Sequence, residues 1–311
     1  MQGTGNSQWL LIGMLVAIFA VAATADDSAT KENLPQTGEK QESASLLIRE
    51  SSVAGIEHVF QLTSRIWSGG EPKDATAFDQ LADLGVQTII SVDSAKPNVA
   101  AAKKLGIRYI HIPTRYEGLD RETQLRIFRA VKESRGGIFF HCHHGKHRGP
   151  AAAAIGCIAE ESATPTEALR ILADAGTSTE YDGLWESVRK CQPPSKDETL
   201  PPLVSSADTN PVGMSMARID RLWTRIQEEQ SAEPKRSTKN LVDSTLLLSE
   251  EFRELARVDL SDYDKEFRDM LTESARLATQ MHQQAKEPGR LSPKLVSSLK
   301  QQCQNCHSEW R

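Results

Sequence analysis

The spacing of apolar positions divides the chain into two parts of different character. Between residues 52 and 191, short apolar runs such as VQTIISV and GGIFFHC alternate with segments of helical period such as DATAFDQLADLG and DRETQLRIFRAVKES. Strands that alternate with helices predict a mostly parallel sheet flanked by helices on both faces. We therefore expect an α/β domain over residues 52–191, with the strand-like pair EHVFQLTSRIW near its start.

The pattern changes after residue 191. Residues 192–210 have no apolar period and are rich in proline, which predicts a linker. Four segments within residues 211–311 then carry an apolar stripe at helical spacing. In the first of them, one face carries Val212, Met216, Ile219, Trp223 and Ile226. Four helices with short connections predict an all-α four-helix bundle over residues 211–311.

The N-terminal segment has the pattern of an export signal. An apolar run from Trp9 to Ala23 is followed by the small-x-small sequence ATA and by two aspartates. Two interpretations stay open. The missing basic residue before the run is unusual for a cleaved signal peptide over residues 1–25. The run is short for a retained membrane anchor. Either one places the rest of the chain outside the cytoplasm, in the periplasm. The polar residues 26–51 predict a disordered spacer.

Composition adds two constraints. The net charge is −5 and charged residues make up 25% of the chain, so nothing favours nucleic acid as a partner. Five cysteines, an odd number, argue against a simple disulfide framework in an exported protein. We expect Cys157 and Cys191 to be small buried residues, with a resolving thiol or a disulfide as the alternative.

The stretch HCHHGKHRGP, residues 141–150, lies between an apolar strand and an alanine-rich helix. At a helix N-terminus, backbone N–H groups and the helix dipole hold a phosphate and stabilise a thiolate. Cys142 is therefore a candidate nucleophile, and Arg148 can grip two phosphate oxygens. Gly145 permits the tight turn that points the amides inward. His141 is placed to orient the loop by hydrogen bonding.

The remaining residues of this loop make it strongly basic. They are His143, His144, Lys146 and His147. A metal site is one interpretation, but ligands this close together lack the separated pairs that zinc prefers. Phosphate polyanions fit better, because Lys146 and His147 can flank additional phosphate groups. We therefore expect residues 143–148 to bind phosphate.

The motif HCHHGKHR resembles the signature of the cysteine-dependent protein tyrosine and dual-specificity phosphatases, in which five residues separate Cys from Arg. The sequence WSGGEP, residues 67–72, is similar to the opening segment of the compact dual-specificity branch. The lysine–histidine pair at residues 146–147 resembles the inositol-phosphate-directed members. The resemblance covers about residues 56–191. It implies hydrolysis of phosphomonoesters through a phosphocysteine.

Two departures from that family leave the activity open. The family has Ser or Thr after the arginine, which helps the thiolate leave from the intermediate, and Gly149 stands there. The family's general acid is an Asp on a loop that corresponds to IPTRYEGLD. Glu117 is the preferred candidate, because Asp120 is already placed to cap a helix. The third alternative is that this protein has no general acid. The alternative to a phosphatase is therefore a catalytically inactive phosphate-binding module.

Near the C-terminus, the sequence CQNCH has the spacing of a c-type haem attachment site. Cys303 and Cys306 can add to the two vinyl groups of haem, and His307 then lies where it can coordinate the iron. Structural zinc needs a second Cys or His pair, which the nearby sequence lacks. The ending CQNCHSEWR resembles cytochrome c-prime and its cytochrome c-556 relatives over about residues 211–311. This resemblance implies haem c and a homodimer.

The two branches of that family differ at the sixth iron ligand. In the c-556 branch a Met on the first helix binds the iron, which implies an electron carrier with a redox partner. In the c-prime branch the position is vacant and small gases bind. Met216 lies on the apolar stripe, where core packing is the alternative role, and Met214 is the second candidate. A further hypothesis is that the haem redox state controls the Cys142 thiol.

Overall fold

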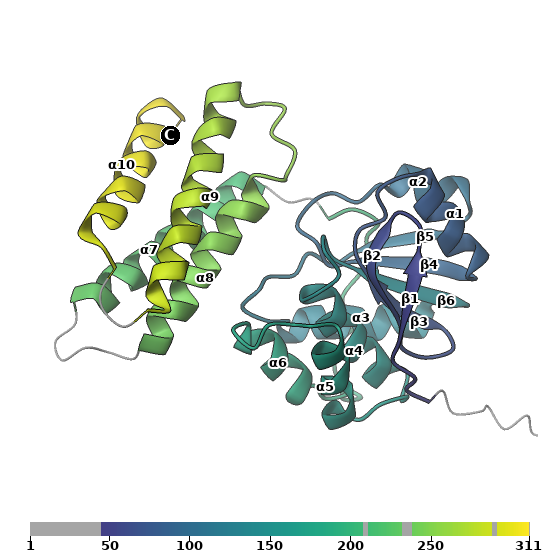
Figure 1. Ribbon diagram of the computed structural model, residues 1–311. Helices are drawn as coiled ribbons and strands as arrows, with labels where there is room; N and C mark the ends of the chain where they lie inside the picture. The colour runs from purple at the N-terminus through teal and green to yellow at the C-terminus, as the bar shows by residue number, and fades with distance from the viewer. Residues whose placement is uncertain (1–44, 208–210, 232–237, 288–290, 311) are drawn as a thin grey trace, which may run out of the picture. The chain divides into compact units, whose positions relative to one another are not determined.

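The computed structural model describes residues 45–207, 211–231, 238–287 and 291–310 (Figure 1). The expected signal segment, residues 1–25, lies outside the described residues, as does the expected spacer up to residue 44. Residues 42–311 group into one compact unit. Within the described part of the chain, every helix is too short or too polar to cross a membrane.

The first half of the unit is built on a six-stranded sheet in the order β1-β2-β3-β6-β4-β5. The strands are β1 Arg49–Val53, β2 Ile56–Gln61, β3 Ile66–Gly69, β4 Val86–Ser91, β5 Arg108–His111 and β6 Gly137–His141. The β3–β6, β6–β4 and β4–β5 pairs are parallel. The β1–β2 and β2–β3 pairs are antiparallel. The sheet is therefore mixed, with its parallel half around β6.

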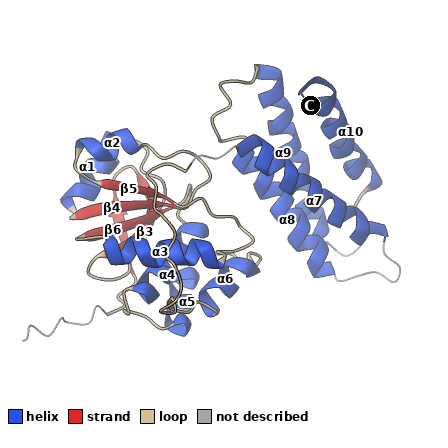
Figure 2. Cartoon of the chain, turned by 180° about the vertical axis from the view of Figure 1, so that it is seen from behind, coloured by secondary structure: helices blue, strands red, loops and turns tan. Residues whose placement is uncertain are grey.

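Helices cover both faces of this sheet (Figure 2). They are α1 Ala75–Asp83, α2 Val99–Lys104, α3 Arg121–Glu133, α4 Arg148–Ala159, α5 Pro165–Asp174 and α6 Asp182–Arg189. One core cluster joins the sheet to α1 and α2, and a second joins it to α3–α6. All five residues of β6 are buried, as expected for a strand covered on both faces. Asp120 caps α3 by accepting a hydrogen bond from the Thr123 amide, as predicted.

The second half of the unit is a helical region with a core of its own. Its helices are α7 Pro211–Ser231, α8 Thr238–Leu255, α9 Lys265–Ala285 and α10 Pro293–Trp310. Packing joins α7 to α8, α8 to α9 and α9 to α10. Ile226, Leu248, Leu255 and Met281 are completely buried in the core that these helices share. The helical character is as expected, and the closed four-helix bundle stays a prediction.

The segments on either side of the α/β domain are more structured than their composition suggested. Strand β1 begins at Arg49, inside the stretch expected to be a disordered spacer. The proline-rich residues 192–207 form neither helix nor strand, yet they attach to the domain. The His111 amide donates to the Val204 carbonyl at 2.9 Å, and Arg129 donates to the carbonyls of Leu200 and Pro201 at 3.1 and 3.0 Å. This part of the linker therefore lines the open edge of β5.

Candidate active site

The HCHHGKHRGP motif forms the loop between β6 and α4. Strand β6 ends at His141 and α4 begins at Arg148, so the five residues between Cys142 and Arg148 make the turn. The loop lies at the carboxyl end of the parallel strands, where open α/β sheets bind ligands. The amides of the first helical turn have no partners within the helix and are available to an anion there. The strand–loop–helix setting is the one predicted.

The shape of the loop depends on a close approach of two backbones. Gly145 has φ +73°, and a Cβ on it would lie 2.4 Å from the carbonyl carbon of Gly69 and the amide nitrogen of Gly70. The Glu71 amide donates to the His143 carbonyl at 3.1 Å. Only glycine fits at position 145, because any side chain there would collide with the backbone of residues 69 and 70. The absence of a side chain lets residues 67–72 pack directly against the loop.

On the other side of the loop, Thr177 fixes its position. The Thr177 hydroxyl donates to the Lys146 carbonyl at 2.6 Å. This bond fixes the backbone beside Lys146, whose side chain is partly exposed. The ammonium group of Lys146 therefore remains accessible to an anion at the loop.

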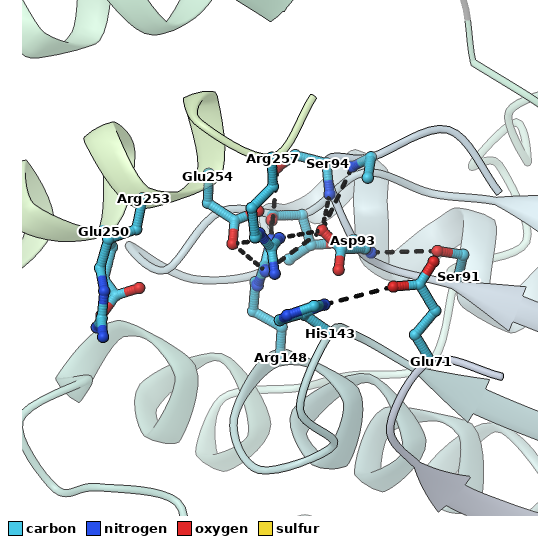
Figure 3. Close-up of polar contacts among 12 residues, drawn as sticks. Glu71, Ser91, Asp93, Ser94, His143, Arg148, Glu250, Arg253, Glu254 and Arg257 are labelled. Carbon is cyan, nitrogen blue, oxygen red and sulfur yellow. Dashed lines mark hydrogen bonds and ion pairs between the residues drawn. The ribbon is translucent and has the colours of Figure 1, made fainter. Parts of the chain in front are cut away.

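Arg148 is the most enclosed charged side chain of the structure's described part. Its exposed fraction is 1%, and that of Cys142 is 3%. The guanidinium donates to the Thr114 carbonyl at 3.1 Å and lies 4.3 Å from the centre of the Tyr116 ring. It also donates to Glu254 Oε1 at 2.8 Å and lies 3.6 Å from Asp93 Oδ1 (Figure 3). These contacts fix the plane of the guanidinium at the loop.

A second arginine completes this charged cluster. Arg257 donates to Asp93 Oδ1 at 2.8 Å and to Glu254 Oε1 at 2.7 Å. Burial raises the pKa of Asp93, but Arg148 and Arg257 outweigh burial and hold that pKa well below its usual range. For Glu254 burial prevails, and its pKa is raised. Burial alone would lower the pKa of Arg148, but the surrounding anions, Glu254 first, raise it further above its ordinary value, so Arg148 remains charged.

The sequence did not reveal Asp93, Glu254 or Arg257 as members of the site. Asp93 follows β4 at the same sheet edge as the loop, which is a usable signal once the strand order is known. Glu254 and Arg257 are three residues apart on a helical segment, where opposite charges usually lie on a solvated face. Their meeting with the loop is visible only in the folded chain.

Two histidines of the motif are neutral at pH 7. The Nε2 atom of buried His141 lies 2.6 Å from the Tyr109 hydroxyl, and burial lowers the pKa of His141 to about 4. Burial, reinforced by Arg148, lowers the pKa of His147 to about 4 as well. The His147 ring packs 4.6 Å from the Tyr181 ring. His141 and His147 therefore add no positive charge to the loop at neutral pH, whereas Arg148 and Lys146 do.

The other two loop histidines point towards acidic residues. His143 Nδ1 lies 3.3 Å from Glu71 Oε2, and the exposed His144 has its Nδ1 3.9 Å from Glu57 Oε2. Both are long contacts, and they leave the two imidazoles at the rim of the loop. Glu71, Asp93 and His143 bring ligand atoms within 4.8 Å of one another. Arg148 and Arg257 already neutralise Asp93, which disfavours a cation at that point.

The two general-acid candidates have different surroundings. Asp120 is engaged as the cap of α3. Glu117 is exposed on a turn closed by a bridge between Arg115 and Gly118, beside the Tyr116 that covers Arg148. Within the described residues, Glu117 makes no hydrogen bond with the loop. Glu117 is therefore open to solvent.

The CQNCH sequence lies on α10. Cys303 and Cys306 are three positions apart and therefore share a helix face, and both contact the helical core. Burial raises the pKa of Cys303 to about 11, and it raises the pKa of Cys306 as well. His307 is exposed. The ring of Trp310 meets that of Phe267 edge-on at 5.6 Å, which joins the end of α10 to α9.

The two candidate methionines on α7 face different surroundings. Met216 is partly buried and packs against the helical core that also holds Cys306. Met214 lines a cavity beside the loop together with Ser94, Thr114 and Glu254. Cys157 and Cys191 are buried in the α/β core, as predicted for small structural residues.

Of the comparisons with known proteins, only the one with solved structures finds similar chains. No protein-family model and no curated protein matches the chain. P. aeruginosa TpbA is similar with 20% identity and a TM-score of 0.35, over 48% of this chain and 98% of TpbA. Its complex with phosphotyrosine gives 18% identity and a TM-score of 0.35, over 49% and 99%.

A yeast phosphatase is a further structural neighbour. The core catalytic domain of the PP-IP phosphatase SIW14 from S. cerevisiae, in complex with citrate, gives 16% identity and a TM-score of 0.40. The match covers 45% of this chain and 89% of that domain. These neighbours cover about half of the chain. Identities and scores this low assign no activity to it.

The neutral state of His141 leads to a prediction for stability. The unfolded chain takes up a proton near pH 6.5 and the folded chain only near pH 4, so the unfolding free energy should fall as pH drops through this window. The expected loss from His141 is about 1.4 kcal/mol per pH unit. Chemical denaturation at pH 7, 6 and 5 should give a shallower dependence for His141→Gln than for the wild type. Identical dependences would contradict the assignment.

Proposed function

We propose that the chain is an exported two-domain protein that combines a cysteine-dependent phosphatase with a c-type haem domain. The observation that carries the first half is the meeting of Cys142 and Arg148 at the N-terminus of α4, on a loop shaped by Gly145. A sulfur nucleophile, a fixed guanidinium and free helix amides together suit a phosphoryl group. The substrate class is a phosphomonoester, and Lys146 favours one with further anionic groups.

In the proposed reaction the loop holds three phosphate oxygens while Cys142 attacks phosphorus. The sulfur–phosphorus bond forms as the ester oxygen leaves and takes a proton from an acid or from water. Glu117 is the preferred candidate for that acid, and its exposed side chain would have to turn towards the leaving oxygen. Water then breaks the sulfur–phosphorus bond, which releases inorganic phosphate and restores the thiolate. Arg148 stabilises the charge of both transition states.

Gly149 supports a second candidate function, that of a phosphate-binding module without turnover. A Cβ on Gly149 would lie 3.4 Å from the Cys142 sulfur and 3.1 Å from its amide nitrogen. A hydroxyl at this position would therefore reach the sulfur and help it leave, and glycine supplies none. The breakdown of the phosphocysteine is the step that this absence would slow.

The first prediction is that Cys142 is required for turnover. The full-length protein should release phosphate from an aryl phosphate, and Cys142→Ser should reduce the rate to background because the serine hydroxyl is a far weaker nucleophile. Cys157→Ser, which changes a buried thiol elsewhere in the same domain, is the matched control. If the wild type and Cys142→Ser bind phosphate equally but neither turns over, the binding-module function is correct.

A second prediction concerns the missing hydroxyl. Gly149→Ser should raise kcat by roughly a hundredfold or more if breakdown of the intermediate limits turnover, since proton transfer by a positioned side chain typically contributes about 10²- to 10⁴-fold. Gly149→Ala carries the same Cβ, which is already tight against the Cys142 amide, and serves as the steric control. A gain in kcat with serine but not with alanine would support a slow breakdown of the phosphocysteine. Equal rates for both variants would show that the hydroxyl has no role here.

The second half of the proposal is a c-type haem on the helical region. Cys303 and Cys306 would form the two thioether bonds, and exposed His307 would bind the iron from the end of α10. The donor set fits, because both thiols lie on one helix face against an apolar core. When bound, the haem would supply electron transfer or gas binding. Met216 is the proposed sixth ligand, and its packing in the same core as Cys306 supports it.

Export, a periplasmic location and a homodimer belong to this proposal. Haem attachment to paired cysteines and a signal peptide are mutually consistent, since each implies the same compartment. A redox partner follows if Met216 binds the iron. A membrane attachment follows only if the N-terminal apolar run is retained.

The haem proposal predicts a covalent chromophore. Protein matured in a host with c-type haem attachment should keep its Soret absorbance after denaturation and extraction. The double variant Cys303→Ala/Cys306→Ala should lose it, whereas Cys191→Ala, which removes a buried thiol of the α/β domain, should not. An extractable haem, or zinc in its place, would contradict covalent attachment.

A further inference from the structure

Helix α8 brings a carboxylate to the position where a phosphate should bind. Glu254, in the last turn of α8, accepts a hydrogen bond from Arg148 at 2.8 Å although 106 residues separate them. Its exposed fraction is 7%, so this is an enclosed contact rather than a surface pair. Figure 3 shows Glu254 at the end of α8, and Arg257 just beyond it, reaching Arg148 and Asp93. A carboxylate and a phosphate present the same feature to a guanidinium, namely anionic oxygens for charge-assisted bonds.

The contact extends beyond this ion pair. The Tyr181 hydroxyl donates to Glu250 Oε1 at 3.0 Å, one helical turn before Glu254. Leu246, a further turn back, belongs to the core cluster of the α/β domain. Lys286 of the helical region binds Glu180 at 2.7 Å. One face of α8 is therefore seated on the α/β domain through apolar, neutral polar and charged contacts.

This seating encloses Arg148. Cys142 and Arg148 are 3% and 1% exposed, and Glu254 of α8 holds the guanidinium that a phosphate would need. The cover includes Tyr116, which stacks on Arg148, and Tyr181, which contacts both Tyr116 and Glu250. Cys142 and Arg148 are thus buried, whereas Lys146 and His144 at the rim of the loop stay partly or fully exposed.

We propose that the helical region inhibits the loop in cis, with Glu254 occupying the phosphate position at Arg148 until α8 moves away. The proposal rests on the proposed phosphate-binding function of the loop. It makes the two halves of the chain one regulated protein. The phosphatase half is off in the closed arrangement and gains access to substrate when α8 withdraws.

A phosphate group of a substrate could replace the Glu254 carboxylate in this charged cluster. Within the described residues, Arg148 Nε, Arg257 Nε, Asp93 Oδ2 and Glu254 Oε2 are buried without a hydrogen-bond partner. Buried groups left unpaired weaken the closed state. Arg148 gives Glu254 one hydrogen bond, whereas a phosphate can take two from the same guanidinium and more from the α4 amides. A phosphate therefore competes with Glu254 on favourable terms.

The test is neutralisation of Glu254. Glu254→Gln keeps the shape of the side chain but removes its charge, so it should weaken closure and tighten the binding of inorganic phosphate, measured by calorimetry on the full chain. Loss of one charge-assisted bond corresponds to roughly a tenfold to hundredfold gain. Glu251→Gln is the matched control. It lies on the same helix at 8% exposure, and its carboxylate binds Arg218 of α7 at 2.7 Å instead of the loop.

A second variant weakens the closed state without changing Glu254 itself. Arg257→Gln removes the bridge between Asp93 and Glu254 and leaves the two carboxylates facing each other beside Arg148. It should also tighten phosphate binding, by a smaller factor. Equal phosphate affinity in the wild type, Glu254→Gln and Arg257→Gln would overturn the proposal.

Turnover of an aryl phosphate, measured on the same proteins, separates this inference from the proposed function. Tighter phosphate binding without turnover in any variant would support cis inhibition and reject the phosphatase. Full turnover in the wild type with no gain in Glu254→Gln would support the phosphatase and reject cis inhibition. A gain in both binding and rate, absent from Glu251→Gln, is the expected result.

Discussion

A guanidinium that is almost completely buried needs anions and dipoles around it, and the contacts of Arg148 organise much of this structure. Removing a charge from water costs several kcal/mol unless partners compensate for it. Here the partners come from separate elements: Asp93 after β4, the Thr114 carbonyl and Tyr116 ring after β5, and Glu254 on α8. The requirement to neutralise one side chain thus joins the loop, the sheet edge and the helical region.

The loop that carries Arg148 is shaped by steric constraint more than by charge. The positive φ of Gly145 and its contact with the backbone of residues 69 and 70 leave no room for a side chain. Burial, meanwhile, keeps His141 and His147 neutral, so the basic appearance of the motif overstates its charge at pH 7. What remains is a compact anion site built from backbone amides, one fixed arginine and one accessible lysine.

Much of this arrangement follows from local sequence signals, and the rest does not. The apolar run before the motif and the alanine-rich segment after it were sufficient to place the loop between a buried strand and a helix. The strand pair expected in EHVFQLTSRIW is present as β2 and β3, but β1 was harder, because it begins in a polar stretch at Arg49. Glu254 carried no local signal at all, since its role depends on tertiary packing across 106 residues. The haem site stays a prediction from its motif, supported by two thiols that share a helix face and contact the helical core.

The most direct test of the loop's chemistry is to capture the covalent intermediate. Because Gly149 supplies no hydroxyl to the sulfur, a phosphocysteine should persist long enough for acid quenching during turnover of an aryl phosphate. Peptide mass spectrometry should then find one phosphoryl group on Cys142. Turnover with the phosphoryl group on another residue, or with none on Cys142 at any quench time, would contradict a cysteine phosphatase.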